Sequence, residues 1–164
     1  MTSFPLTELR DLQASIGAAN AAKGFHDEGD ALRHQVASPF VGESDMSGEV
    51  ARYDATNLRN YYANKLLLVV SEVVEAHDEL RKGRAVDDTY YSSPSHDYMD
   101  ADEADAYLVE HGFPAKPEGF LSEASDVVIR MFDLCDEAGL DLAAMIEEKL
   151  EFNATRNHMH GKKF

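Results

Sequence analysis

Residues 65–80 read KLLLVVSEVVEAHDEL and decide the fold class, because this apolar run has a helical period and carries acids at fixed spacing. At about 100° per residue, its apolar side chains fill a wide arc and its charged side chains form a narrow stripe at the edge of that arc. The arc comprises Leu66, Val69, Val70, Val73, Val74 and Leu80, and the stripe comprises Lys65, Glu72, Glu75 and Glu79. We expect a long, mostly buried helix with carboxylates beside its buried surface.

A second stretch, GFLSEASDVVIRMFDLC at residues 119–135, repeats the arrangement with Glu123 and Asp126. Residues three apart on a helix face the same way, so each acidic pair can present two carboxylates to one ion. Four converging carboxylates repel one another unless they spread apart, hold protons or bind a hard cation. Ligation by oxygen alone is typical of magnesium, manganese or calcium. We interpret Glu72, Glu75, Glu123 and Asp126 as a Mg²⁺ site for phosphate chemistry, with Mn²⁺ as an alternative ion.

Helical periodicity predicts an all-α fold of four helices in a single domain, residues 1–164. The helices are expected at residues 7–23, about 54–82, 120–138 and 141–156, with Gly83 and Gly139 as terminators and Asp141 as a cap. Residues 24–53 show no sustained period and are predicted to be a long connection with one short helical turn at most, in which His26 belongs to a solvated loop. Residues 84–119 are predicted to be an insertion with one possible short helix at 101–110, and residues 157–164 a basic tail.

The last predicted helix carries cationic and amide groups. Lys149, Asn153 and Arg156 recur at i, i+4 and i+7 and point in the same general direction as the residues expected on its inward face, which are Leu142, Met145, Ile146, Leu150 and Phe152. Such groups suit phosphate oxygens, and snorkelling toward solvent is the alternative. Lys65 either neutralises the acidic stripe or meets a phosphate.

Composition excludes several classes of function. Thirty-one acidic and 15 basic residues give a net charge of −16, which argues against binding to nucleic acid or to anionic membranes. No stretch is long enough to span a membrane and the first residues have no leader pattern, so we expect a cytoplasmic protein. Cys135 is expected to be a buried small residue without chemistry. A glycine-rich phosphate loop, a Cys/His metal set and a GxSxG elbow are all missing from the sequence.

These motifs resemble the all-α nucleoside triphosphate pyrophosphohydrolases, often called MazG-like. The signature of that family, ExxE followed by ExxD, reads EVVE at residues 72–75 and EASD at residues 123–126. The similar blocks span residues 65–84 and 116–164, and include the KPEGF lead-in, the D-x-x-I-R-x-x-D run and the K-x-x-x-N-x-x-R-x-x-x-H-G-K ending. The connector between the two acidic pairs is longer here than is usual in the family, and the chain has no Trp where the family often has one.

The resemblance implies a four-helix MazG-like bundle with an insertion between its two metal-binding helices. It implies that Glu72, Glu75, Glu123 and Asp126 bind Mg²⁺ and are catalytic, and that Lys149, Asn153 and Arg156 contact the phosphate chain. The expected reaction hydrolyses a nucleoside triphosphate to the monophosphate and pyrophosphate, as in house-cleaning of nucleotide pools. An ordinary dNTP, an oxidised or deaminated nucleotide, an alarmone and phosphoribosyl-ATP stay open as substrates. Bundles of this kind often assemble, so a homodimer or homotetramer is expected.

Two readings without turnover are the alternatives. An acidic helical protein can mimic DNA and occupy a nucleic-acid-binding partner, in which case its acids are spread over the surface and Mg²⁺ is not needed. A metal-stabilised helical module differs from the enzyme only in lacking turnover. Within the enzyme reading, Glu75 and Glu79 are both candidates to orient or deprotonate the attacking water.

Overall fold

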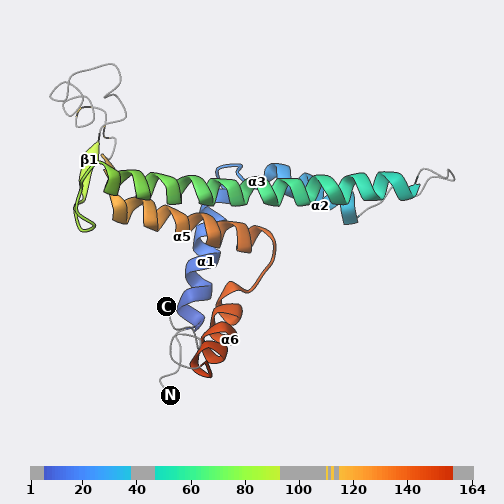
Figure 1. The fold of residues 1–164 in the computed structure, drawn as a ribbon. Coiled ribbons are helices and arrows are strands. Elements are labelled where there is room, and N and C mark those ends of the chain that lie inside the picture. The colour runs from blue at the N-terminus through green and yellow to red at the C-terminus, as the bar shows by residue number, and fades with distance from the viewer. Residues whose placement is uncertain (1–5, 38–46, 93–109, 111, 113–114, 157–164) are drawn as a thin grey trace. The chain divides into compact units, whose positions relative to one another are not determined.

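The computed structural model describes residues 6–37, 47–92, 110, 112 and 115–156 (Figure 1). Its named helices are α1 (Leu6–Ala21), α2 (Asp27–Ala37), α3 (Ser47–Arg81), α5 (Phe120–Glu137) and α6 (Leu142–Ala154). Two strands, β1 (Tyr90–Ser92) and β2 (Lys116–Glu118), form a short antiparallel ladder. The described residues are therefore mostly helical, which confirms the all-α prediction.

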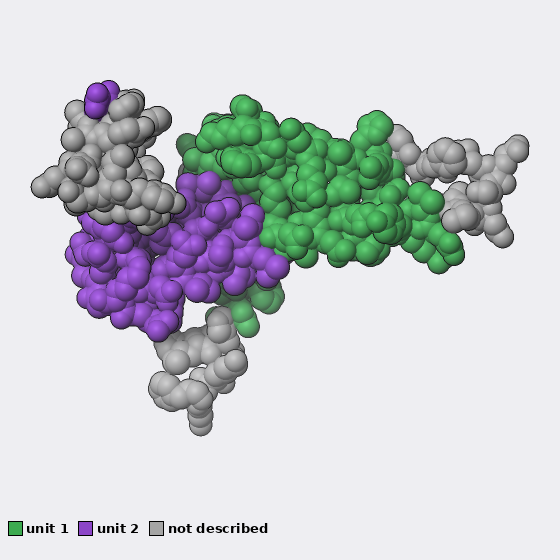
Figure 2. Space-filling model, turned by 90° about the horizontal axis from the view of Figure 1, so that it is seen from above, with its two compact units in different colours: residues 1–65, 131–164 green, residues 66–130 purple. Residues whose placement is uncertain are grey.

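The chain divides into two compact units, coloured separately in Figure 2. Unit 1 consists of residues 1–65 and 131–164, and unit 2 consists of residues 66–130. Helices α3 and α5 each contribute residues to both units, whereas α1, α2 and α6 belong to unit 1 and the two strands belong to unit 2.

Several helix ends agree with the sequence. Helix α3 stops two residues before Gly83 and α5 two residues before Gly139, and both glycines have the positive φ that ends a helix without strain. Asp141 caps α6, because its Oδ1 accepts a hydrogen bond of 3.0 Å from the backbone N–H of Ala144. Local signals of this kind act within one turn, which is why they can be read from the sequence.

The predicted connection at residues 24–53 is wrong in two respects. Residues 27–37 form α2, and α3 begins at Ser47, ahead of the predicted start near residue 54. Helix α2 has no apolar period because it packs through Gly29, where an added Cβ would lie 1.9 Å from Glu137 Oε1. Of the possible helix at 101–110, residues 101–109 lie outside the described residues, as does the tail at 157–164.

Unit 1 is held by close packing and polar contacts around α1. Gly17 of α1 lies so near α5 that an added Cβ would fall 1.9 Å from Asp136 Oδ2, so a larger residue there would force the Asp136 side chain to shift. The Gln13 side-chain amide donates a 2.9 Å hydrogen bond to the carbonyl of Leu140, between α5 and α6. These contacts join α1 to the chain reversal that leads into α6.

Unit 2 joins the last part of α3, the ladder and the first part of α5. Tyr90 of β1 lies opposite Glu118 of β2, and the next residue, Gly119, has a φ of +110°. An added Cβ at Gly119 would lie 2.4 Å from the carbonyl oxygen of Asp88, so the chain turns tightly there and enters α5 at once. Figure 1 shows the ladder at the end of α3, where α5 begins. The predicted insertion thus contains a strand pair that the sequence analysis did not anticipate.

The apolar arc of residues 65–80 is not buried as predicted. Val69 and Ala76 are 8% and 7% exposed, but the remaining apolar residues of the run lie largely in the open. Exposure is between 40% and 64% for Leu66, Leu67, Leu68, Val70, Val73, Val74 and Leu80. The buried face of this segment instead consists of Val69, Glu72, Ala76 and Glu79, and so includes two acids of the stripe.

Candidate metal centre

Three carboxylates of unit 2 meet across α3 and α5. Glu72 and Glu75 lie one turn apart on α3, and Glu123 lies in the first turn of α5. One oxygen of each lies within 4.8 Å of the oxygens of the other two. Glu72 and Glu123 are buried, with exposures of 5% and 4%, whereas Glu75 is exposed. We call these three residues the carboxylate cluster.

The packing of α3 explains why two of its acids point inward. Val69, Glu72, Ala76 and Glu79 are its buried residues in unit 2, and their spacing of three, four and three is that of a face packed against a neighbour. A globular protein normally fills such positions with apolar side chains. Placing glutamate at two of them is unfavourable unless the charges are balanced, so each carboxylate needs a partner.

Glu72 has such a partner on α5. Arg130 directs both Nε and Nη2 at Glu72 Oε1, each at 2.6 Å. The side chain of Glu72 is 6% exposed and that of Arg130 is 41% exposed. A guanidinium that reaches in from the surface therefore neutralises the buried carboxylate.

Glu79, one turn beyond Glu75, is also balanced. Its carboxylate contacts Lys82 Nζ at 2.5 Å, Arg84 Nε at 3.3 Å and the hydroxyl of Tyr90, which donates a hydrogen bond of 3.2 Å. The Lys82 hydrogen bond is the main reason that the pKa of Glu79 lies below its ordinary value. With three donors on its two oxygens, Glu79 is a weaker candidate than Glu75 for activating a water.

Glu123 is the carboxylate that lacks such a partner. Among the described residues, no hydrogen bond or ion pair reaches its carboxylate. Burial, together with the nearby charges of Glu75, Glu118 and Glu72, raises the pKa of Glu123 to about 7 against the opposing charge of Lys116. The cluster thus holds a buried acid that ionises readily only if another cation arrives.

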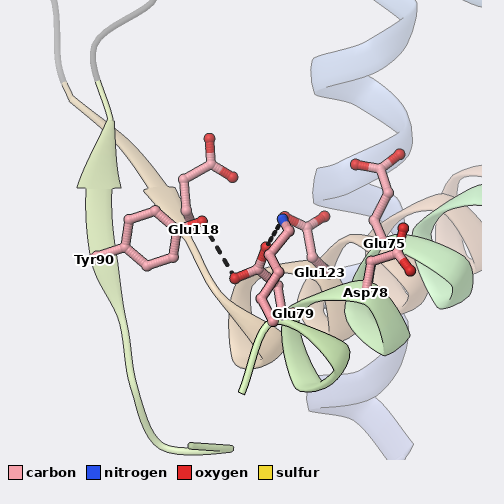
Figure 3. A pocket seen from close by; sticks show the side chains of 7 residues that line it. Glu75, Asp78, Glu79, Tyr90, Glu118 and Glu123 are labelled. Atoms are coloured by element: carbon pink, nitrogen blue, oxygen red, sulfur yellow. Dashed lines mark hydrogen bonds and ion pairs between the residues drawn. The ribbon is translucent and has the colours of Figure 1, made fainter. Parts of the chain in front are cut away.

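The cluster opens onto a cavity of about 260 Å³ beside the strand ladder (Figure 3). Figure 3 shows the side chains of Glu75, Glu79 and Glu123 in this cavity with Tyr90 of β1 across from them. The lining is almost entirely polar and consists of Glu75, Asp78, Glu79, Lys82, Tyr90, Glu118 and Glu123. Two members of the cluster therefore face a space that a ligand can enter.

Asp126 does not belong to the cluster in this structure. It lies one turn after Glu123 on α5 and is half-buried, but its oxygens are not among those that lie within 4.8 Å of one another. Its assignment as a metal ligand stays a prediction.

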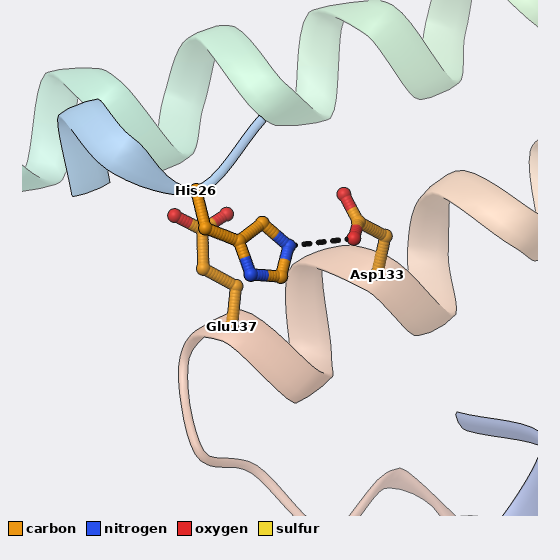
Figure 4. Close-up of side chains that lie close together, drawn as sticks. All are labelled: His26, Asp133 and Glu137. Carbon is orange, nitrogen blue, oxygen red and sulfur yellow. Dashed lines mark hydrogen bonds and ion pairs between the residues drawn. The ribbon is translucent and has the colours of Figure 1, made fainter. Parts of the chain in front are cut away.

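A second group of potential ligands lies in unit 1, beside Lys65, and the sequence analysis did not identify it. This group consists of His26, Asp133 and Glu137, and all three are buried (Figure 4). His26 Nε2 lies 2.7 Å from Asp133 Oδ1, so His26 is not in a solvated loop as predicted. We call these three residues the histidine cluster.

Two cations balance the two acids of the histidine cluster. Lys65 Nζ lies 3.0 Å from Glu137 Oε2 and 3.5 Å from Asp133 Oδ2, and Arg33 Nη1 lies 3.4 Å from Glu137 Oε1. Burial alone would raise the pKa of Asp133, but the hydrogen bonds from His26 and Asn20 and the charge of Lys65 outweigh it and hold that pKa below its ordinary value. These cations offset charge on both acids, but Arg33 also contacts Asp30 at 2.6 Å, and Glu137 Oε2 accepts no hydrogen bond among the described residues.

Of the remaining predicted ligands, Lys149 and Asn153 lie on α6 and Arg156 lies two residues beyond its end, all in unit 1. Lys149, Asn153 and Arg156 are exposed, and the Lys149 ammonium and the Arg156 guanidinium lie 6.0 Å and 5.7 Å from the ring centre of Phe152. The inward face of α6 is marked by Ala143, which is 1% exposed, whereas Met145, Leu150 and Phe152, predicted to face inward, are about half-exposed. The prediction that Met145, Leu150 and Phe152 form an inward face, with the three polar residues pointing in the same direction, is therefore wrong. The role of the three polar residues as phosphate contacts stays a prediction.

One feature of the sequence could have indicated the histidine cluster. Asp133 and Glu137 are spaced i, i+4 within the apolar part of α5, which marks a second acidic pair in a buried context. His26 and Arg33 gave no signal, because both belong to the aperiodic segment that was taken for a loop.

Compared with known proteins, the chain matches no family model, no curated protein and no solved structure. None of the described helices combines the length and the apolar character that a membrane crossing requires.

Proposed function

We propose that the chain is a Mg²⁺-dependent nucleoside triphosphate pyrophosphohydrolase of the MazG-like class. The observation that carries the proposal is the carboxylate cluster, in which acids distant in sequence come within 4.8 Å of one another and buried Glu123 has no direct ion pair among the described residues. Oxygen ligands on a rigid helix pair, open to a polar cavity, fit a hard divalent cation. The sequence motifs supply the class of reaction.

The residues of the chain would act by holding charge and geometry. Glu72, Glu75 and Glu123 would hold the ion, which supplies positive charge for the phosphate oxygens and acidifies a bound water. Glu75, exposed in the cavity, is better placed than Glu79 to orient that water. The cations at the rim, Lys82 and Arg84, keep Glu79 ionised and add positive potential near the place where a polyphosphate would lie.

Burial of the acids disfavours the DNA-mimic alternative. A mimic presents its carboxylates to a partner, but Glu72, Glu79 and Glu123 are each exposed by 5% or less, as the enzyme reading requires. The substrate class stays a nucleoside triphosphate, with a dNTP or a modified nucleotide as the first candidates.

We further propose that the working form is a homodimer or homotetramer. The support comes from the exposed apolar run of α3 and from Leu121, Val128 and Ile129 of α5, which are 57%, 47% and 40% exposed. A second copy of the chain would cover these residues. Light scattering at micromolar concentration should give at least twice the monomer mass of 18.2 kDa, and a monomer would contradict this part of the proposal.

The enzymatic proposal is tested by product analysis. Wild type, Glu75→Gln and Glu123→Gln should be incubated with a panel of nucleoside triphosphates and Mg²⁺, with pyrophosphate and monophosphate identified separately. We expect turnover by wild type and a loss of at least about 100-fold in both variants, since each removes a ligand charge. Glu49→Gln, an exposed acid in the first turn of α3, is the matched control and should retain activity. Equal turnover in all four proteins would reject the site.

A further inference from the structure

Arg130 contacts one oxygen of the carboxylate cluster while part of its side chain stays in solvent. Both of its contacts, from Nε and Nη2, go to the same oxygen, Glu72 Oε1. Among the described residues, no hydrogen bond or ion pair reaches Glu72 Oε2. The guanidinium therefore satisfies half of the carboxylate, while 41% of the Arg130 side chain stays in contact with solvent.

Without a bound ion, Arg130 neutralises Glu72 within the cluster, and the nearby charge of Lys116 acts on Glu123. Three carboxylates converge, and Arg130 is the one cation paired directly with any of them in the described part of the chain. Removing it would leave Glu72 as a buried charge without a partner, which proteins avoid.

The other cations near the cavity are engaged elsewhere. Lys82 and Arg84 are paired with Glu79, and Lys116 lies 3.1 Å from Glu118 Oε2. None of these partner acids belongs to the cluster, so a change at the cluster leaves those pairs intact. Arg130 alone among these four has a predicted metal ligand as its partner.

We propose that Arg130 is a counter-ion that divalent metal displaces, and that the released guanidinium then binds the phosphate chain of the substrate. The inference rests on the proposed function. A divalent ion held by the three carboxylates would cancel most of the negative charge that attracts the guanidinium and would compete with it for Glu72 Oε1. Arginine has the fork geometry for phosphate oxygens, and the half-exposed stem of Arg130 allows it to turn toward the solvent. Arg130 thus acts as a positioning residue that becomes available only when the metal is in place.

The test compares Arg130→Gln with wild type in metal binding, without any nucleotide. Calorimetric titration with Mn²⁺ should show about tenfold tighter binding in the variant, because no arginine has to be displaced from Glu72. The melting temperature of the metal-free variant should be lower than that of wild type, and Mn²⁺ should raise it by more. The exposed Arg10, paired with Asp141 at 2.7 Å, provides the control Arg10→Gln, which should leave the metal affinity unchanged.

Binding of a non-hydrolysable nucleoside triphosphate analogue to the metal-loaded protein is the second readout. Arg130→Gln should weaken it at least tenfold, and Arg130→Lys, which keeps the charge but not the fork, should fall between the variant and wild type in both measurements. Unchanged or weaker Mn²⁺ binding in Arg130→Gln would overturn the proposal, as would unchanged binding of the analogue. If wild type hydrolyses nucleotides but Arg130→Gln lacks either the tighter Mn²⁺ binding or the weaker analogue binding, the role of Arg130 is rejected and the proposed function stands. If wild type binds no divalent metal, both the role of Arg130 and the proposed function are rejected.

Discussion

The two units of the chain each contain a group of three potential metal ligands, three of them buried in unit 1 and two in unit 2, but they balance the charges differently. In the histidine cluster of unit 1, Lys65 and Arg33 contact the carboxylates of Asp133 and Glu137, and the protein supplies its own cations. In the carboxylate cluster of unit 2, three acids share one paired arginine, and Glu123 has no direct partner. Residue types alone would rank both groups as metal sites. The positions of the cations separate a self-contained structural network from a site with room for an ion.

The largest effect should come from removing the internal cation of unit 1. Lys65→Met leaves Asp133 and Glu137 buried with less compensation, and breaking such a buried pair typically lowers the free energy of unfolding by about 3–5 kcal/mol. Urea denaturation of the metal-free protein would measure it. Lys23→Met, at an exposed site after α1, is the control and should change stability little. A loss below about 1 kcal/mol for Lys65→Met would mean that the histidine cluster is not charge-balanced as described.

The response to Mg²⁺ should distinguish the two clusters directly. At about 100 times its dissociation constant, a ligand that binds only the folded protein stabilises it by about 2.7 kcal/mol. We expect Mg²⁺ to raise the melting temperature of wild type and of Asp133→Asn, whose site lies in unit 1. Glu123→Gln should abolish the response. If Asp133→Asn lost the Mg²⁺ response and Glu123→Gln kept it, the assignment of the two clusters would have to be exchanged.

The third effect concerns pH and depends on Glu123. Its pKa in the folded protein is about 7, above the ordinary value of 4.5, so the folded state binds this proton more tightly than the unfolded state. The free energy of unfolding of the metal-free protein should therefore fall as the pH rises, by about 2 kcal/mol between pH 5 and pH 7 from this group. Mg²⁺ affinity should change in the opposite direction, by about tenfold per pH unit below 7, because the ion needs the ionised carboxylate.

Denaturation of wild type and Glu123→Gln over this pH range isolates the contribution, since all other titrating groups are common to both proteins. The groups that face Glu123 are Lys116 and Glu118 from the β2 side and Glu72 and Glu75 from α3. Parallel pH profiles for the two proteins would contradict the raised pKa.

The sequence predicted the parts of the fold that depend on local chemistry. The ends of α5 and the Asp141 cap follow from helical spacing and turn residues within a few positions. The approach of the ExxE pair to Glu123 joins two helices and was expected from the charge argument and the family resemblance, not from local spacing. Helix α2 was missed because it packs through Gly29 and through polar contacts of Arg33, neither of which creates an apolar period. The direction of the buried face of α3 was also missed. Residues 65–80 contain apolar side chains on most of their surface, so periodicity alone could not indicate that the buried face would include Glu72 and Glu79.

The smallest effect should come from removing one cation beside Glu79, and it tests whether the charge of Glu79 is neutralised in the same way as the acids of unit 1. Lys82 is 60% exposed, and Glu79 keeps Arg84 and the hydroxyl of Tyr90 when Lys82 is lost. Lys82→Met should therefore destabilise the protein by less than about a quarter of the effect of Lys65→Met, since an exposed partner contributes little. The double variant with Arg84→Met should lose more than the two single variants added together, because only then does Glu79 retain no cation. An effect of Lys82→Met as large as that of Lys65→Met would show that contact with solvent does not explain the difference between the units. The balance would then have to be sought in the number of cations around each acid.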